Sequence, residues 1–132
     1  MKINDFKVAV IGLGYVGLPL IVLANKKYST VGFDINKDRI VELKNNFDKT
    51  FEVSENELME IQTLFTSDPK KIRDCNIKII TVPTPINEQR QPDLRPILSA
   101  TEIVAENIKK NDIVIYESTV YPGLTEDICM PL

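Results

Sequence analysis

Three glycines near the start of the chain have the spacing of a turn that binds phosphate. Gly12, Gly14 and Gly17 follow an apolar run at residues 8–11 and precede a helix-like stretch at residues 18–27. Gly12 permits a tight turn, Gly14 lets the main chain approach a diphosphate without an intervening side chain, and Gly17 allows close helix–strand packing. The free N–H groups and the positive dipole end of a helix N-terminus favour such an anion.

An acidic residue completes this pattern. A second apolar run, residues 30–33, ends on Asp34, which lies 20 residues beyond Gly14. A carboxylate at this place accepts hydrogen bonds from the adenosine ribose and repels a 2′-phosphate, so the pattern predicts NAD rather than NADP. The alternative is a glycine-rich turn beside an acidic strand end, with no ligand.

Four further side chains are candidates for the same site. Arg39 either lies against the adenine or ribose, or is a solvated arginine on a helix surface. Tyr15 either covers the pyrophosphate or fills the floor of the cleft. Thr84, between two prolines, and Thr119 follow predicted strands and could contact the cofactor. Prolines that merely end a strand and a hydroxyl that merely caps a turn are the alternatives.

The elements that must position these residues alternate between strands and helices. Apolar, β-branched runs predict strands at residues 7–11, 30–34, 64–66, 77–82 and 112–116. Helical spacing and capping residues predict helices at residues 15–27, 37–45 and 94–108, with short helices after Ser54 and from Pro69. This alternation predicts an α/β fold: a single domain over residues 1–132 with a Rossmann-type, doubly wound parallel sheet in the order 3-2-1-4-5. The candidate residues then follow strand ends at one edge of the sheet.

Composition narrows the possible functions. The 132 residues include 16 basic and 19 acidic side chains, a balance that argues against nucleic-acid binding. The longest apolar stretch, residues 16–24, is shorter than the about 20 residues of a membrane span, and no apolar leader opens the chain. A cytoplasmic location is therefore predicted. With no histidine and only two isolated cysteines, Cys75 and Cys129, we predict no metal site and reduced thiols that serve as packing residues.

Four segments together resemble a known family, the UDP-glucose/GDP-mannose dehydrogenases, in their N-terminal NAD-binding domain. The opening segment is KVAVIGLGYVGLP at residues 7–19. Three more are similar to the branch that oxidises UDP-N-acetylglucosamine or UDP-N-acetylgalactosamine to the uronic acid for capsule, Vi-antigen and O-antigen sugars: TVPTPIN at 81–87, QPDL at 91–94 and YESTVYPG at 116–123. The resemblance implies a four-electron oxidation with two NAD molecules and a thioester on an active-site cysteine.

The resemblance also implies roles for individual residues. The cofactor-binding positions that it implies are Gly12, Gly14, Tyr15, Val16, Gly17, Asp34, Arg39, Thr84 and Thr119. Thr119 is also the one implied catalytic position, where it helps to place the hydrolytic water. Cys75 and Cys129 do not match the family's cysteine motif, and its cysteine, lysine and most UDP-sugar contacts would lie beyond Leu132. We therefore expect this chain to bind NAD as a monomer without turning over alone, whereas the parent protein is a homodimer.

Three other interpretations stay open at this point. The first is a stand-alone regulatory domain that senses NAD or another nucleotide and performs no reaction. The second is part of a flavin enzyme, since FAD sites share the glycine turn and the acid. The third is a subunit interface with an assembly role.

Overall fold

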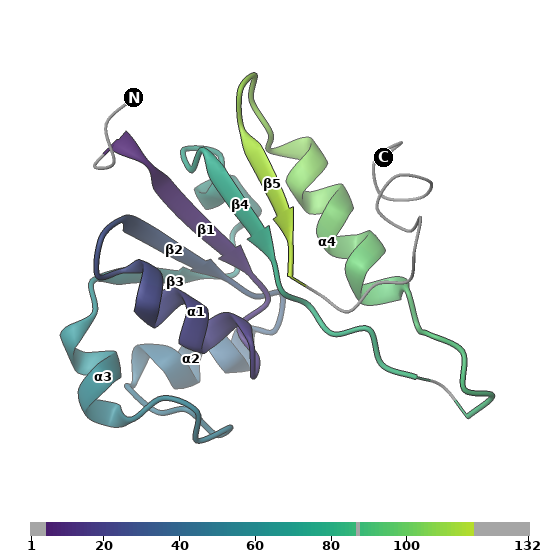
Figure 1. Ribbon diagram of the computed structural model, residues 1–132. Helices are drawn as coiled ribbons and strands as arrows, with labels where there is room; N and C mark the ends of the chain where they lie inside the picture. Colours follow the sequence, from purple (N-terminus) through teal and green to yellow (C-terminus); the bar gives the residue numbers. More distant parts are fainter. Residues whose placement is uncertain (1–4, 87, 118–132) are drawn as a thin grey trace.

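Five parallel strands form one sheet in the order β3-β2-β1-β4-β5, as predicted (Figure 1). The structure is a computed structural model that describes residues 5–86 and 88–117. In the register of the sheet, Val10 of β1 lies between Gly32 of β2 and Ile79 of β4. The strands are β1 (Lys7–Ile11), β2 (Ser29–Phe33), β3 (Thr63–Thr66), β4 (Ile77–Ile80) and β5 (Ile113–Tyr116).

The helices lie where the sequence predicts them, with ends that differ by at most three residues. They are α1 (Gly17–Ala24), α2 (Lys37–Lys44), α3 (Glu55–Glu60), the 3-10 helix η2 (Pro69–Ile72) and α4 (Arg95–Glu106). The helix α1 begins at Gly17 rather than Tyr15, because Tyr15 and Val16 belong to the preceding turn. Asn36 caps α2 through its side chain, and the predicted capping box of Ser54 and Glu57 opens α3.

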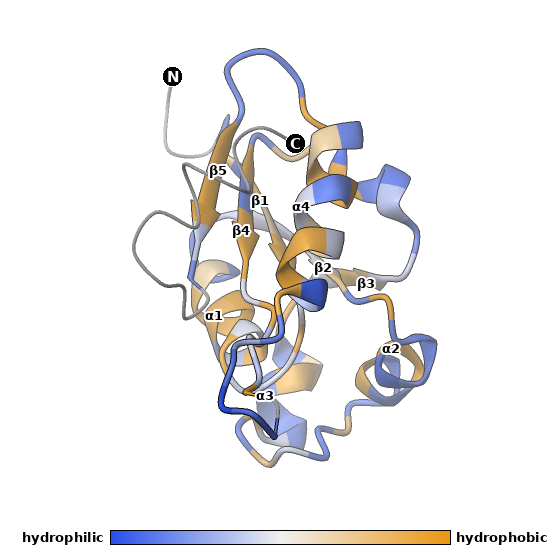
Figure 2. Ribbon diagram, turned by 90° about the vertical axis from the view of Figure 1, so that its right-hand side faces the viewer, coloured by the Kyte–Doolittle hydropathy of each residue, from blue (hydrophilic) through white to orange (hydrophobic). Residues whose placement is uncertain are grey.

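Each face of the sheet carries its own hydrophobic core. Along β1, Val8 and Val10 pack toward α1, α2 and α3, whereas Ala9 and Ile11 pack toward α4 and η2. Burial on both faces explains why this strand is apolar almost throughout. Figure 2 shows the same dominance of hydrophobic residues in β1, β4 and β5. The predicted helices on both faces are therefore confirmed.

One buried charge interrupts the apolar strand β4. Lys78 is fully buried, and its ammonium donates to the Cys75 carbonyl and to Oδ2 of Asp112, 2.7 Å away. Burial acts to raise the pKa of Asp112, but the hydrogen bonds from Lys78 and from the Lys109 amide lower it. The pair ties β4 to the start of β5 at the edge where both strands begin.

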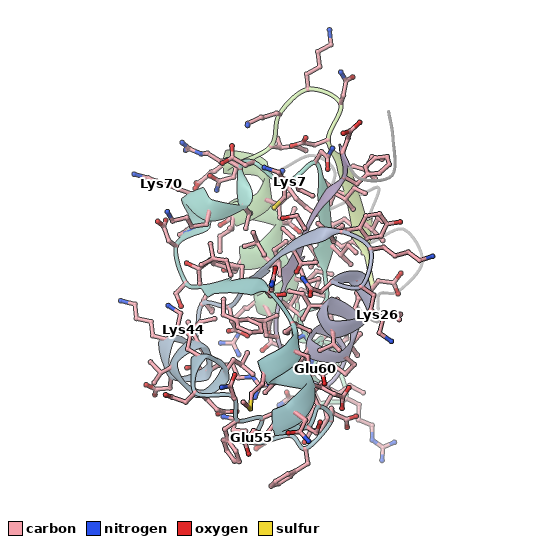
Figure 3. The ribbon with its side chains drawn as sticks, turned by 90° about the vertical axis from the view of Figure 1, so that its left-hand side faces the viewer. Lys7, Lys26, Lys44, Glu55, Glu60 and Lys70 are labelled. Carbon is pink, nitrogen blue, oxygen red and sulfur yellow. The ribbon has the colours of Figure 1, made fainter. Side chains whose placement is uncertain are left out.

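Many lysines lie on the surface instead. In Figure 3 the lysines Lys26, Lys44 and Lys70 lie apart from one another, in the turn after α1, on α2 and on η2. Of the helices in the described ranges, none has the length and apolar character needed to cross a bilayer.

Candidate cofactor-binding site

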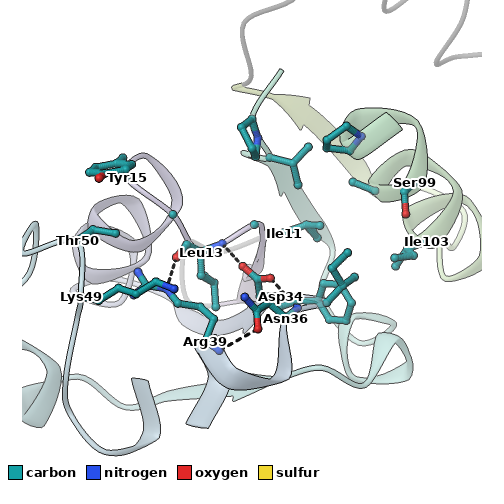
Figure 4. A pocket seen from close by; sticks show the side chains of 18 residues that line it. Ile11, Leu13, Tyr15, Asp34, Asn36, Arg39, Lys49, Thr50, Ser99 and Ile103 are labelled. Atoms are coloured by element: carbon teal, nitrogen blue, oxygen red, sulfur yellow. Dashed lines mark hydrogen bonds between the residues drawn. The ribbon is translucent and has the colours of Figure 1, made fainter. Parts of the chain in front are cut away.

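A cleft of about 380 Å³ opens at the carboxyl edge of the sheet (Figure 4). Its walls come from the glycine turn, the ends of β1 and β2, the start of α2, the loop 46–53, the segment after β4, and α4. The lining residues are Ile11, Gly12, Leu13, Gly14, Tyr15, Phe33, Asp34, Ile35, Asn36, Arg39, Lys49, Thr50, Val82, Pro83, Pro96, Ser99, Ala100 and Ile103. The glycine turn, the strand-ending acid and the segment after β4 thus meet at one edge, as predicted from parallel strands.

Two of the three glycines are required by the protein's own packing. Gly12 has φ +101°, and a Cβ there would lie 2.9 Å from the backbone nitrogen of Val82. A Cβ on Gly17 would lie 1.8 Å from the Gly12 carbonyl oxygen and 2.5 Å from Oγ1 of Thr81. That Thr81 hydroxyl donates to the Gly12 carbonyl and holds the turn against the end of β4. The positive φ and the contact with Val82 therefore account for Gly12, and the close approach of α1 to the turn accounts for Gly17.

Gly14 has no such structural reason. Its φ lies outside the left-handed region, and a Cβ built on it would meet no atom of the described chain within 4 Å. The fold would accept a side chain here, yet the position lines the cleft and carries none. A bare main chain beside open space at the entrance to α1 suits a ligand that approaches the backbone, such as a diphosphate.

Asp34 links the glycine turn to α2. Its Oδ2 accepts from the Leu13 amide and its Oδ1 from the Asn36 amide, each at 2.9 Å. These bonds hold the carboxylate at the wall of the cleft, where the side chain is half-buried. Each carboxylate oxygen has a second acceptor position, so the group retains the capacity to bind two ribose hydroxyls.

Arg39 is not the solvated helix-surface arginine that was the alternative interpretation. Its side chain is 5% exposed and lines the cleft. Nε donates to the Leu13 carbonyl at 2.7 Å, and Nη1 pairs with Asp48 at 2.9 Å and with Glu42 at 2.5 Å. Within the part of the chain that the structure describes, the buried Nη2 has no hydrogen-bond partner. The surface alternative is wrong because the tertiary fold brings Leu13 and Asp48 against this side chain and buries it.

Asp48 organises the loop after α2 through its hydrogen bonds, and the sequence analysis did not identify it. Its carboxylate accepts from Arg39, from the amide and hydroxyl of Thr50, and from the amides of Glu52 and Val53. Burial would raise its pKa, but the bonds from Thr50, Arg39 and Val53 lower it to about 2. The hydrogen bonds of Asp48 organise residues 47–53, where neither a helix nor a strand was predicted, and bring Lys49 and Thr50 to the cleft. An aspartate two residues before a threonine was the available turn signal.

The other predicted site residues are placed as follows. Tyr15 is 69% exposed and lines the cleft, whereas Val16, 54% exposed, precedes α1 and does not line it. Thr84 is half-buried and is not among the lining residues, although its neighbour Pro83 is. Thr119 lies outside the described residues.

The helix α4 supplies the far wall of the cleft, and the sequence analysis predicted this helix without assigning it to the site. Pro96, Ser99 and Ile103 of α4 line the cleft, and Figure 4 shows Ser99 and Ile103 across from Asp34 and Asn36. Together with Ile35, which is 67% exposed, they form a largely apolar wall, and the hydroxyl on this wall is that of Ser99. Such walls suit a flat ring such as adenine.

Comparison with known proteins tests the open interpretations. Residues 6–132 match the family model described as the UDP-glucose/GDP-mannose dehydrogenase family, NAD binding domain. The chain belongs to this family. The match confirms the predicted family, fold and cofactor, and it contradicts the flavin alternative.

Members of this family match the chain over nearly all of its length. It is 56% identical over 131 residues to the UDP-N-acetyl-D-glucosamine 6-dehydrogenase of Salmonella typhi, and 55% over 130 residues to that of Pseudomonas aeruginosa. Each match covers 98% of this chain and 31% of the relative. A solved UDP-D-ManNAc dehydrogenase from Pyrococcus horikoshii superposes with a TM-score of 0.86 at 33% identity, over 92% of this chain and 30% of that one. The chain thus spans about a third of the length of these relatives.

Proposed function

We propose that this chain is the NAD-binding part of a nucleotide-sugar 6-dehydrogenase that oxidises a UDP-N-acetylhexosamine to its uronic acid for surface polysaccharide synthesis. Two relatives that are more than half identical carry the name UDP-N-acetyl-D-glucosamine 6-dehydrogenase. The match extends across 98% of the chain, so it includes the turn, Asp34 and the segment after β4. NAD, when bound, accepts hydride from the 6-carbon of the sugar.

The observation that best supports the proposal is that Gly14 carries no side chain although the fold would accept one. A glycine that neither packing nor backbone conformation requires lies at the entrance to α1 and borders the cleft. We assign the diphosphate to this point, against the amides of the turn that ends at Gly17. Asp34 then accepts from the ribose hydroxyls, and its charge excludes a 2′-phosphate. Arg39 lies beside Asp34 and supports the adenosine half.

The residues nearer the reaction belong to the proposal too. Thr84 and Thr119 contact the nicotinamide half, and Thr119 helps to place the water that hydrolyses the thioester. Tyr15 covers the diphosphate from its exposed position on the turn. Cys75 is not the nucleophile, because it is buried in the core beside α4, and burial raises the pKa of its thiol.

Calorimetric titration of NAD and NADP tests the assignment of the cleft. We expect the parent chain to prefer NAD, and Asp34→Ala to weaken NAD by about tenfold or more, because a charge-assisted hydrogen bond contributes about 1.5–3 kcal/mol. NADP binding should change less, since the substitution also removes a repulsive charge. Equal affinity of the parent chain for both dinucleotides would remove the assignment of Asp34.

A stand-alone nucleotide sensor is the alternative for the whole protein. A sensor and a dehydrogenase would both bind NAD, so the oxidation of the sugar must be measured. We expect no uronic acid from UDP-N-acetylglucosamine or UDP-N-acetylgalactosamine and NAD with the 132-residue chain alone. Production by a protein in which this domain is joined to a cysteine-bearing domain would support the dehydrogenase, and a gene encoding this domain alone would support the sensor.

The setting of the activity follows from the same proposal. We place it in the cytoplasm, where UDP-sugars and reduced thiols coexist, with most sugar contacts outside this chain. The isolated chain should sediment as a monomer, with dimerisation belonging to the parent protein. A tight dimer of the 132-residue chain would contradict this expectation.

A further inference from the structure

This cleft is lined by two residue types that favour different cofactors, one NAD and the other NADP. A carboxylate at the end of the second strand, Asp34, selects the free ribose 2′-hydroxyl of NAD. An arginine near that carboxylate is the residue type that accommodates the 2′-phosphate of NADP, and Arg39 lies five residues on. Lys49 adds a second basic residue to the lining. The residue types alone therefore do not settle which cofactor the adenosine end prefers.

The contacts of Arg39 resolve this conflict. Its Nε is held by the Leu13 carbonyl, and its Nη1 is shared by the carboxylates of Glu42 and Asp48. The side chains of the three charged residues are 5%, 14% and 0% exposed, so the network is shielded from solvent. Two negative charges on one guanidinium compensate its positive charge, and three anchor points on Nε and Nη1 fix its position, while Nη2, which has no partner in the described chain, is buried with the rest of the group.

The anchors are themselves fixed by other bonds. Asp48 accepts four further hydrogen bonds from residues 50–53, and its low pKa keeps it ionised near neutral pH. Oε2 of Glu42 also accepts from the Lys49 amide at 2.8 Å. Moving Arg39 would therefore leave two carboxylates without their cation and disturb the loop that carries Lys49.

We infer that Glu42 and Asp48 are specificity-determining positioning residues. By holding Arg39 against the glycine turn and compensating its charge, they deny a 2′-phosphate the cation it would need and reinforce the selection of NAD. The inference rests on the proposed function, because it concerns the cofactor of the same cleft. Neither residue needs to touch the cofactor, since both act through Arg39.

The test is the ratio of NADP to NAD dissociation constants for the 132-residue chain and its variants. Glu42→Gln and Asp48→Asn each remove one compensating charge and keep nearly the same shape. We expect each to lower the ratio by about three- to tenfold, as for a partly screened charge a few ångströms from a phosphate. Glu60→Gln, an exposed glutamate on α3 (Figure 3), removes the same charge outside this network and should leave the ratio unchanged.

A double substitution shows whether the effect passes through Arg39. Adding Arg39→Gln to Glu42→Gln should return the ratio to that of Arg39→Gln alone, because no cation is then left to release. The milder Glu42→Gln carries the test if thermal unfolding shows that Asp48→Asn does not fold.

The outcomes separate the inference from the proposed function. A parent chain that prefers NAD, with Glu42→Gln folded and its ratio unchanged, overturns the inference and leaves the function intact. Equal weakening of NAD and NADP has the same meaning, since it reports a purely structural role. A parent chain that binds neither dinucleotide overturns the proposed function, and the inference falls with it.

Discussion

At the scale of single residues, three glycines within one turn are present for different reasons. Gly12 and Gly17 are required by contacts inside the protein, and a Cβ on Gly17 would overlap the Gly12 carbonyl at 1.8 Å. Gly14 is free of such contacts within the described chain. The same substitution at two of these positions therefore separates the fold from ligand binding.

Gly17→Ala should destabilise the chain by about 3 kcal/mol or more, because the turn and α1 must separate to admit the methyl group. Gly14→Ala should change the free energy of unfolding by less than about 1 kcal/mol yet weaken NAD binding by about tenfold or more. Urea unfolding and calorimetry measure the two effects. A Gly14→Ala chain that binds NAD like the parent would remove the diphosphate from this point.

The buried carboxylate of Asp48 should make stability depend on pH. Its pKa of about 2 in the folded chain lies below the ordinary value of 3.8, so the native state favours the ionised form. The stabilisation, about 2 kcal/mol, is complete above about pH 4 and is lost as the pH falls through about 2. Urea unfolding of the parent chain against Asp48→Asn should show this extra loss in the parent. Parallel pH profiles would contradict it.

At the scale of elements, a buried ion pair links strands at the edge of the sheet where they begin, and the cleft lies at the edge where they end. The Lys78–Asp112 pair joins β4 to β5 near the ends where these strands begin. The cleft lies at the opposite edge, beyond Ile11 and Phe33. A defect in the pair should therefore affect stability and spare the ligand.

Asp112→Ala should destabilise the chain by about 3–5 kcal/mol, since it leaves a buried ammonium without its counter-charge. Combining it with Lys78→Met should recover most of that loss, because no buried charge then remains unpaired. Urea unfolding of the two single variants and the double variant measures the coupling. Additive losses would show that the pair does not act as a unit, and the folded double variant should bind NAD like the parent.

At the scale of the whole molecule, the cleft lies between α2 and α4, which belong to two hydrophobic cores on opposite faces of one sheet. Because NAD would contact the turn, β2 and α4 together, its binding should stabilise the entire domain. We expect NAD at about a hundred times its dissociation constant to add about 2.7 kcal/mol, with a smaller effect of NADP at the same concentration. Thermal unfolding with each dinucleotide measures this, and identical shifts would contradict the predicted preference.

The alternation of apolar runs with capped helices predicted the strand order and the helical segments α1 to α4 and η2 of the described residues, because hydrophobic periodicity and capping act over a few neighbouring residues. The glycine spacing and Asp34 likewise identified the cleft edge, since parallel strands end together. Arg39 and Lys78 were different. Their charges are buried by partners that the fold brings in, such as Leu13 for Arg39 and Asp112 for Lys78. Local pattern cannot encode a contact of that kind, so the placement of these two cations, and with it the loop around Asp48, was decided only when the chain folded.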